Sequence, residues 1–323
     1  MGSGHPAPGR RARAVAAAAV LAVVASATTA AGHAEVYAAP APLPALSAAA
    51  LDARYQAVDA EIARARATAL RVRDRGRARA LAAFLAPGRR FLAFDARGRG
   101  RAVEVLGDLA RADRIAVVVP GADTALANFD SPKFVGGGSR ALYRQARADA
   151  PGERIAVIAW LGYRAPRTLS PEVLTSGPAA DGARALGRFL TGVRAANGRA
   201  RIALLCHSYG SVVCGKAARH LAPAPVDEIA LFGSPGVTAH RASDLGTSAR
   251  VWAGRAGGDW MEYVPNVRFA GIGFGADPAS PEFGARRFDA GTGPHSAYLK
   301  PGTVALRNLA LIALGRDAQV APA

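Results

Sequence analysis

Cysteine, lysine and aromatic residues are all scarce in this chain of 323 residues. The two cysteines form no Cys-x-x-Cys pair and the histidines form no His-x-x-x-His pair, so the usual spacing of metal ligands is missing. We therefore expect neither a metal ion nor a cofactor. Cys206 and Cys214 flank a predicted strand-to-helix turn. We expect their side chains to point in different directions as small buried residues, without forming a disulfide.

Lysine occurs only at Lys133, Lys216 and Lys300, so arginine supplies nearly all of the net charge of +17. Binding to a nucleic acid would favour arginines gathered on one face with aromatic residues between them. Many arginines lie instead in helix-like stretches, as between residues 64 and 75. The composition therefore argues against a nucleic acid partner. A loose attraction to an anionic cell envelope is the expected consequence of the charge.

The N-terminus has the pattern of an export signal. Arg10, Arg11 and Arg13 precede an uncharged run from Ala14 to Gly32 that is rich in Ala and Val. A basic stretch, an apolar run and small residues at its end are typical of a secretory signal peptide. We predict cleavage within residues 31–39 and a secreted or envelope-associated protein. A retained membrane anchor is the alternative, since the run approaches the roughly 20 residues that span a bilayer.

The rest of the chain is long and apolar enough for one large domain, because 50% of the residues are hydrophobic. We divide it into a signal peptide and linker over residues 1–39, an N-terminal helical segment over 40–88 and one α/β domain over 89–323. Residues 47–84 are rich in Ala, Leu and Arg with few helix breakers, which predicts one or two amphipathic helices.

Within the large domain, strand-like and helix-like stretches alternate. Short runs at 91–94 and 102–106 predict a hairpin. Continuous apolar runs then predict buried parallel strands over residues 114–119, 154–160, 202–206, 228–232 and 250–253. Helices are predicted over residues 141–148, 182–196, 211–221 and 304–314. The fold class is therefore α/β, with a mostly parallel, doubly wound sheet, helices on both faces and N-terminal helices before it.

The stretch from Ile202 to Val213 has the order strand, polar turn with small residues, helix. A nucleophile elbow needs this order, because its serine lies in a strained turn that exposes the hydroxyl at the sheet edge. The start of the helix also places backbone amides near developing negative charge. We predict Ser208 as the nucleophile. Gly210 matches the glycine that usually follows the nucleophile, whereas Cys206 stands where a glycine usually precedes it.

The predicted strand over residues 114–119 is followed by a loop that begins with Pro120 and Gly121. Hydrolases of this architecture take one oxyanion-hole amide from the loop after this strand. They take the other from the residue after the nucleophile. We therefore predict an oxyanion hole made by the amides of Ala122 and Tyr209. An ordinary Pro-Gly turn is the alternative interpretation of the loop.

The other two catalytic groups should follow the nucleophile in the order acid, then histidine. Among the six histidines, only His295 lies late enough, in the loop before the last predicted helix. The acid should follow the predicted strand over residues 250–253. Asp259 stands just beyond that strand and is the preferred acid, and Asp277 stays open as a competitor.

Six short motifs, three of which include residues named above, occur in order over roughly residues 91–315. They are 119–121 (VPG), 158–163 (IAWLGY), 207–210 (HSYG), 233–236 (GSPG), 283–288 (FGARRF) and 295–299 (HSAYL). In these motifs the chain resembles an uncharacterised actinobacterial alpha/beta-hydrolase family, carried as a domain of unknown function. The resemblance implies the alpha/beta-hydrolase fold and the serine nucleophile but names no substrate. The family usually has glycine at the position of Cys206.

Together these residues predict an exported serine hydrolase that cleaves an ester. His295 would take the proton of Ser208, the serine would attack the acyl carbonyl, and water would later release the acid. A peptidase or amidase would use the same triad. A different class is a non-catalytic envelope protein that keeps the fold as a binding scaffold.

The same sequence predicts an open site for a small-molecule or lipid ester. Only residues 237–249 separate two predicted strands where many such enzymes insert a helical cap. Residues 129–140 or the N-terminal helices are candidates for a partial roof. Four aromatic residues near strand ends are candidates for an acyl pocket or plain core: Trp160, Tyr163, Trp260 and Tyr263. The oligomeric state stays open.

Overall fold

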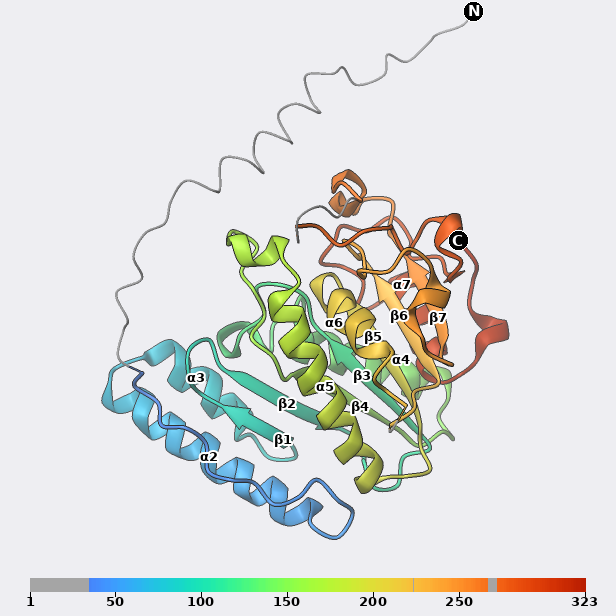
Figure 1. Cartoon of the computed structure of the whole chain (residues 1–323). Coiled ribbons are helices and arrows are strands. Elements are labelled where there is room, and N and C mark those ends of the chain that lie inside the picture. Colours follow the sequence, from blue (N-terminus) through green and yellow to red (C-terminus); the bar gives the residue numbers. More distant parts are fainter. Residues whose placement is uncertain (1–34, 223, 267–271) are drawn as a thin grey trace, which may run out of the picture.

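The computed structural model describes residues 35–222, 224–266 and 272–323. Residues 10–32, on which the prediction of a signal peptide rests, lie outside the described residues. An eight-stranded sheet runs through the molecule in the order β1-β2-β4-β3-β5-β6-β7-β8 (Figure 1). Among the described residues, no helix has the length and apolar character needed to cross a membrane.

The parallel strands are the continuous apolar runs of the sequence. They are β3 (Arg114–Val119), β4 (Ile155–Leu161), β5 (Arg201–His207), β6 (Glu228–Phe232) and β7 (Arg250–Gly254). Every residue of β4 and β6 is buried, because helices cover both faces of the sheet. The predicted bounds of these strands are confirmed to within one residue at each end. β7 also pairs in parallel with β8 (Arg286–Arg287), a short strand that the sequence did not predict.

The predicted hairpin is confirmed and adds an antiparallel edge to the sheet. It consists of β1 (Arg90–Asp95) and β2 (Arg101–Leu106), which pair in antiparallel fashion. β2 in turn pairs antiparallel with β4. The parallel, doubly wound part of the sheet therefore extends from β4 to β8, and β5 lies near its centre.

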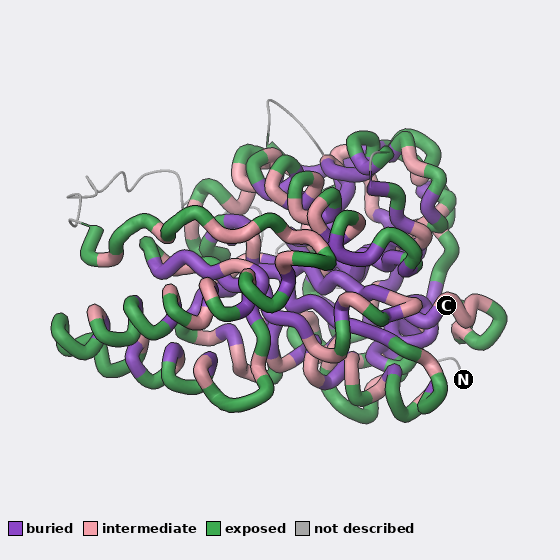
Figure 2. Tube along the Cα trace, turned by 90° about the horizontal axis from the view of Figure 1, so that it is seen from below, coloured by how far each residue is buried: buried purple, intermediate pink, exposed green. Residues whose placement is uncertain are grey.

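Four helices pack on the parallel strands in two pairs. α5 (Gly177–Ala196) contacts α6 (Tyr209–Ala218), and α4 (Val135–Asp149) contacts α7 (Val304–Ala313). Figure 1 shows the first pair in front of the sheet and the second pair behind it. Buried residues gather along the central strands, whereas the outer faces of the helices are exposed (Figure 2).

The N-terminal segment forms two helices at the β1 edge of the sheet. α2 (Leu51–Arg71) packs against β1 and against α3 (Arg75–Phe84). Asp74 caps α3 by accepting a hydrogen bond from the backbone of Arg77. Strands β2, β4 and β3 lie between β1 and β5, so these helices do not roof the carboxyl end of β5.

Candidate active site

Ser208 occupies the sharp turn between β5 and α6. Its φ of 52° and ψ of −127° lie in a region that residues other than glycine rarely adopt. The turn is held by the Ser208 N–H, which donates to the carbonyl of Phe232 at 2.9 Å. A Cβ at Gly210 would lie 2.4 Å from the carbonyl oxygen of Val119, so only glycine lets α6 pass this close to β3. The local structure is thus that of a nucleophile elbow.

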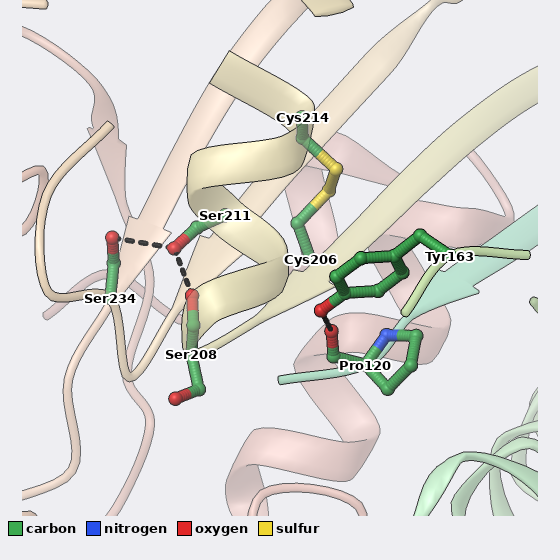
Figure 3. The surroundings of a disulfide bond; sticks show 7 residues. All are labelled: Pro120, Tyr163, Cys206, Ser208, Ser211, Cys214 and Ser234. Atoms are coloured by element: carbon green, nitrogen blue, oxygen red, sulfur yellow. Dashed lines mark hydrogen bonds between the residues drawn. A yellow bond between two sulfur atoms is a disulfide. The ribbon is translucent and has the colours of Figure 1, made fainter. Parts of the chain in front are cut away.

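Cys206 and Cys214 form a disulfide between β5 and α6 (Figure 3). The expectation that their side chains point in different directions was wrong. The chain reverses at Ser208, so α6 runs back against β5 and carries Cys214 over Cys206, with their Cα atoms 6.5 Å apart.

Ser208, His295 and Asp259 come from three separate loops and meet in one chain of hydrogen bonds. His295 Nε2 lies 3.0 Å from Ser208 Oγ. His295 Nδ1 lies 2.8 Å and 3.0 Å from the two carboxylate oxygens of Asp259. The competing acid, Asp277, forms a salt bridge with Arg255 instead. With a proton on Nδ1, the histidine keeps its Nε2 lone pair for the serine hydroxyl.

The Asp259 carboxylate is fully enclosed and well supplied with donors. Only 1% of the residue is exposed. Besides His295, the Met261 N–H donates to Oδ1 at 2.9 Å and the Tyr298 hydroxyl donates to Oδ2. Burial alone would raise the pKa of Asp259, but the hydrogen bonds from His295 and Tyr298 outweigh it and lower that pKa. The carboxylate therefore stays ionised and fixes the ring of His295.

Tyr298 is a functional candidate that the residue-by-residue reading of the sequence missed. Its hydroxyl accepts a hydrogen bond from the Ala256 N–H at 3.0 Å and donates to Asp259. Burial and the nearby carboxylate raise the pKa of Tyr298, so the hydroxyl keeps its proton. The only signal in the sequence was its place in the motif over residues 295–299.

His207, directly before the nucleophile, is a second candidate that was missed. Its Nε2 lies 3.0 Å from the carbonyl oxygen of His295, and the two rings are 4.8 Å apart. Desolvation, followed by repulsion from a protonated His295, lowers the pKa of His207 to about 3. A neutral His207 with its proton on Nε2 can donate to that carbonyl and hold the His295 loop against the elbow.

The loop after β3 passes directly against the nucleophile. A Cβ at Gly121 would lie 2.6 Å from Ser208 Cβ, so this position requires glycine. Ala122 follows at once, and Tyr209 is the first residue of α6, where amides have no partner within the helix. This arrangement is compatible with the predicted oxyanion hole, and the roles of Ala122 and Tyr209 stay predictions.

Neighbouring segments fix the conformation of that loop. Tyr163 donates from its hydroxyl to the carbonyl of Pro120 at 2.7 Å (Figure 3). Asp123, with a φ of 63°, accepts hydrogen bonds at its carboxylate from the N–H and the hydroxyl of Thr168. Its carbonyl accepts from Arg99 at 2.5 Å, which connects the β1–β2 hairpin to the loop. The loop is therefore preorganised before any substrate arrives.

A chain of hydroxyls supports the elbow from the other side. Ser211 donates to the carbonyl of Ser208 and is hydrogen-bonded to Ser234 Oγ at 2.7 Å (Figure 3). The N–H of Gly236 donates to Ser234 Oγ at 3.1 Å. The motif over residues 233–236 thus holds the loop after β6 against the turn that carries the nucleophile.

The connection between β6 and β7, where many such enzymes insert a helical cap, is short. The connection between β6 and β7 holds only the short 3-10 helix η4 (Ala242–Leu245), so the absence of a helical cap there is confirmed. The start of α4 lies beside the histidine loop, because a Cβ at Gly138 would meet the side chain of Leu299 at 2.7 Å. Part of the 129–140 segment therefore flanks the site.

The four aromatic residues suggested for a pocket divide into two pairs. Trp160 and Tyr163 are 1% and 2% exposed and belong to the core. Trp260 and Tyr263 are 48% and 77% exposed, and the ring of Trp260 lies 5.1 Å from that of His295. Among the described residues, no group of three or more His, Cys, Asp or Glu is arranged to hold a metal ion.

A family model described as alpha/beta hydrolase matches residues 95–269. An uncharacterised protein of Mycobacterium tuberculosis is 32% identical over 254 residues, which cover 68% of this chain and 37% of that protein. An uncharacterised protein of Mycobacterium bovis is 33% identical over 169 residues, covering 50% of this chain and 62% of its own length. The chain thus spans little more than a third of the length of the first of these relatives.

Solved structures with a similar arrangement have low sequence identity. A serine hydrolase without lid from Xanthomonas campestris is 15% identical, with a TM-score of 0.41, covering 69% of this chain and 92% of that one. A putative esterase from Staphylococcus aureus is 10% identical, with a TM-score of 0.43, covering 72% of this chain and 84% of its own.

Proposed function

The chain belongs to the alpha/beta hydrolase family, and we propose that it is a serine hydrolase that cleaves carboxylic esters through Ser208, His295 and Asp259. One observation carries the proposal: an unbroken chain of hydrogen bonds from the buried Asp259 carboxylate through His295 to the Ser208 hydroxyl. A serine in a strained turn, beside a histidine whose other nitrogen faces a carboxylate, has the arrangement of an activated nucleophile.

In the proposed reaction, His295 Nε2 takes the hydroxyl proton while Ser208 Oγ attacks the carbonyl carbon of the ester. The amides of Ala122 and Tyr209 stabilise the oxyanion. His295 then gives the proton to the leaving alcohol, and the acyl group stays on Ser208. A water molecule, deprotonated by His295, attacks the acyl-enzyme and releases the acid. Asp259 stays ionised throughout and stabilises the histidine cation.

We propose an ester rather than an amide as the substrate, because the connection between β6 and β7 is short. The short β6–β7 connection leaves the carboxyl end of β5 without a helical cap. We infer that such a site accepts esters presented at a surface. A peptidase or amidase of the same triad is the alternative, and it would cleave an amide matched in acyl group at a comparable rate.

We also propose that the protein is exported. Two observations support this. The sequence before residue 35 has the pattern of a signal peptide. The Cys206–Cys214 disulfide is a bond that persists in oxidising compartments and is rare in the cytosol.

The proposal is tested by hydrolysis of an ester and of an amide with the same acyl group. We expect turnover of the ester, and a loss of about 10³-fold or more in kcat for Ser208→Ala. Asp259→Asn should also lower kcat by orders of magnitude, whereas Asp277→Asn should have little effect. Equal losses in the two Asn variants would contradict the assignment of the acid, and unchanged turnover in Ser208→Ala would contradict the mechanism.

A further inference from the structure

Several large hydrophobic side chains are exposed on the segments that flank the candidate triad. We call this group the apolar rim. Its members are Leu169 at 84% exposure, Trp260 at 48%, Tyr263 at 77% and Ile272 at 54%. Leu169 lies on the connection between β4 and α5, and the other three lie on the connection between β7 and α7.

Contacts join the segments that carry Leu169 and Trp260 to the site, and Tyr263 lies on the same 3-10 helix as Trp260, η5 (Trp260–Tyr263). Thr168, next to Leu169, donates hydrogen bonds to Asp123 in the loop that carries Ala122. Trp260 directly follows Asp259, and its ring packs near His295. These contacts place Leu169 and Trp260 on segments that border the candidate triad.

Ile272 is linked to the site through Tyr209, the first residue of α6. It pairs with Thr175 in an isolated β-bridge. The carbonyl of Thr175 accepts a hydrogen bond from the Tyr209 hydroxyl at 2.7 Å.

The topology places the whole rim at one end of the sheet. β4 and β7 run parallel to β5, so the connections that follow them leave at the same end as Ser208. Figure 1 shows the lime-green segment around residues 165–175 and the orange segment around residue 260 beyond this end of the strands. The rim thus lies at the same end of the sheet as Ser208.

Charge near the rim is mixed, because Glu172 and Glu262 are also exposed on the segments that carry it. An anionic partner is favoured by the net positive charge of the chain as a whole. Arg164 and Arg167 are exposed on the same loop as Leu169. Arg164 pairs with Glu172 at 3.0 Å, yet its side chain is 71% exposed. The chain as a whole carries a net charge of +17. Exposed Trp, Tyr and aliphatic side chains beside arginine are the composition with which proteins bind the interface of an anionic lipid layer.

We propose that the apolar rim docks on a lipid surface with anionic headgroups and that the ester substrate is an amphiphile held in that surface. The substrate part rests on the proposed hydrolase function. Docking would bring Ser208 to the depth of the headgroups without the movement of a lid, because the β6–β7 connection provides no cap over the site.

Docking can be measured without turnover by using the full chain with Ser208→Ala. Of the three tryptophans, Trp160 and Trp252 are 1% and 4% exposed, so a change in emission on binding reports Trp260. We expect a blue shift, together with cosedimentation, when phosphatidylcholine vesicles containing phosphatidylglycerol are added. Vesicles of phosphatidylcholine alone should bind more weakly.

Matched variants locate the docking surface. Leu169→Ser with Tyr263→Ser should weaken binding to the anionic vesicles by about tenfold or more, because two apolar contacts with lipid are lost. Leu70→Ser with Val72→Ser is the control, since these side chains are 56% and 44% exposed at the distant β1 edge. Both variants keep the same N-terminal stretch, so its contribution to vesicle binding cancels.

Three results would overturn the proposal. The first is no change in Trp260 emission with vesicles, and the second is an equal loss of binding in the control variant. The third is a dimer that forms without vesicles and is abolished by the rim substitutions, which would assign the rim to a second copy of the chain. Vesicle binding is measured on the Ser208→Ala chain, which does not turn over substrate. A failure to bind vesicles would therefore say nothing against ester hydrolysis by the unsubstituted chain. Binding without any turnover by the unsubstituted chain would contradict the hydrolase function alone.

Discussion

At the residue scale, the Asp259 carboxylate accepts hydrogen bonds from His295, Tyr298 and the backbone of Met261. The Tyr298 hydroxyl is the donor that a substitution, Tyr298→Phe, can remove with the least change in side-chain shape. The hydroxyl of Tyr298 donates to Oδ2 and so helps to fix the orientation of the carboxylate, whose two oxygens both lie within hydrogen-bond distance of His295 Nδ1. This makes Tyr298 a positioning residue, since it acts on the reaction only through Asp259.

Replacing Tyr298 by Phe should lower kcat on the order of tenfold, the effect of losing one hydrogen bond to a charged group. The pKa of Asp259 should rise, because a donor that stabilises the ionised form is gone. The stability that a depressed carboxyl pKa provides is present at neutral pH and lost as pH falls through the folded-state value. Acid unfolding of Tyr298→Phe should therefore begin at a higher pH than that of the unsubstituted chain.

Tyr55→Phe is the matched control, because Tyr55 is also a buried tyrosine but its hydroxyl has no hydrogen-bond partner among the residues that the structure describes. We expect unchanged kcat and unchanged acid unfolding. Equal behaviour of the two variants would show that Tyr298 contributes only its ring to the core.

His207 should make the protein sensitive to acid well above the range where carboxylates titrate. Its pKa falls from 6.5 to about 3 on folding, so the unfolded chain binds a proton between these values and the folded chain does not. Stability should consequently decline as pH falls from about 6.5 toward 3. In His207→Gln this decline should be smaller, as measured by urea unfolding at pH 7 and pH 5. An identical decline in both chains would contradict the neutral state of His207 in the folded chain.

At the element scale, the turn from β5 into α6 combines two constraints that act on the same reversal of the chain. Gly210 permits the close approach of α6 to β3, and the Cys206–Cys214 bridge ties the second turn of α6 to β5. Both constraints hold the strained Ser208 conformation in place.

Removing the disulfide with Cys206→Ala and Cys214→Ala should lower the free energy of unfolding by about 2–3 kcal/mol, because the bridge closes a short loop. Urea unfolding of the oxidised chain and of the double variant provides the comparison. No loss of stability in the variant would indicate that the bridge is absent from the folded protein.

Gly210→Ala should lower the stability of the fold far more than an ordinary glycine substitution in a helix does. Its Cβ would lie 2.4 Å and 2.7 Å from two backbone carbonyl oxygens, which cannot move as a flexible side chain can. We expect a loss of about 3 kcal/mol or more, measured by thermal unfolding. Gly187→Ala in α5 is the control, because nothing lies within 4 Å of its Cβ, and it should be neutral or stabilising by up to about 1 kcal/mol. Similar losses in both variants would refute the close approach.

The sequence predicted the strands well because buried parallel strands consist of continuous apolar runs. It placed the start of α4 too late, since Gly136, Gly137 and Gly138 disfavour a helix. These glycines are tolerated because each lies against another segment, where a Cβ would collide. β8 consists of two exposed arginines and has no apolar pattern to detect.

The members of the candidate triad could be predicted from the sequence because their order along the chain and their positions in loops after predicted strands identify them. Ser208, Asp259 and His295 were found in this way, and their geometry is compatible with the roles given to them. Tyr298 and His207 were not found, because their contacts arise only when the loops after β5, β7 and β8 come together. The disulfide was not found, because it depends on how closely α6 runs back against β5.

At the scale of the whole molecule, polar contacts connect the antiparallel edge of the sheet to the loop beside the nucleophile. A closed ring of ion pairs joins Arg89, Glu104, Arg140 and Asp130, and so connects β1 and β2 to α4. Arg99 in the hairpin turn reaches the loop after β3. The antiparallel edge is thus tied to the segment that faces the nucleophile, although it lies at the far side of the sheet.

The central claim, that Ser208 is an activated nucleophile, is tested most directly by labelling the purified chain with a fluorophosphonate probe beside Ser208→Ala. The account predicts labelling close to one probe per chain, lost in Ser208→Ala and strongly slowed in a variant that lacks the His295 imidazole. A correctly folded chain that is not labelled, or one labelled equally after Ser208→Ala, would contradict the account and favour a hydrolase fold retained as a binding scaffold.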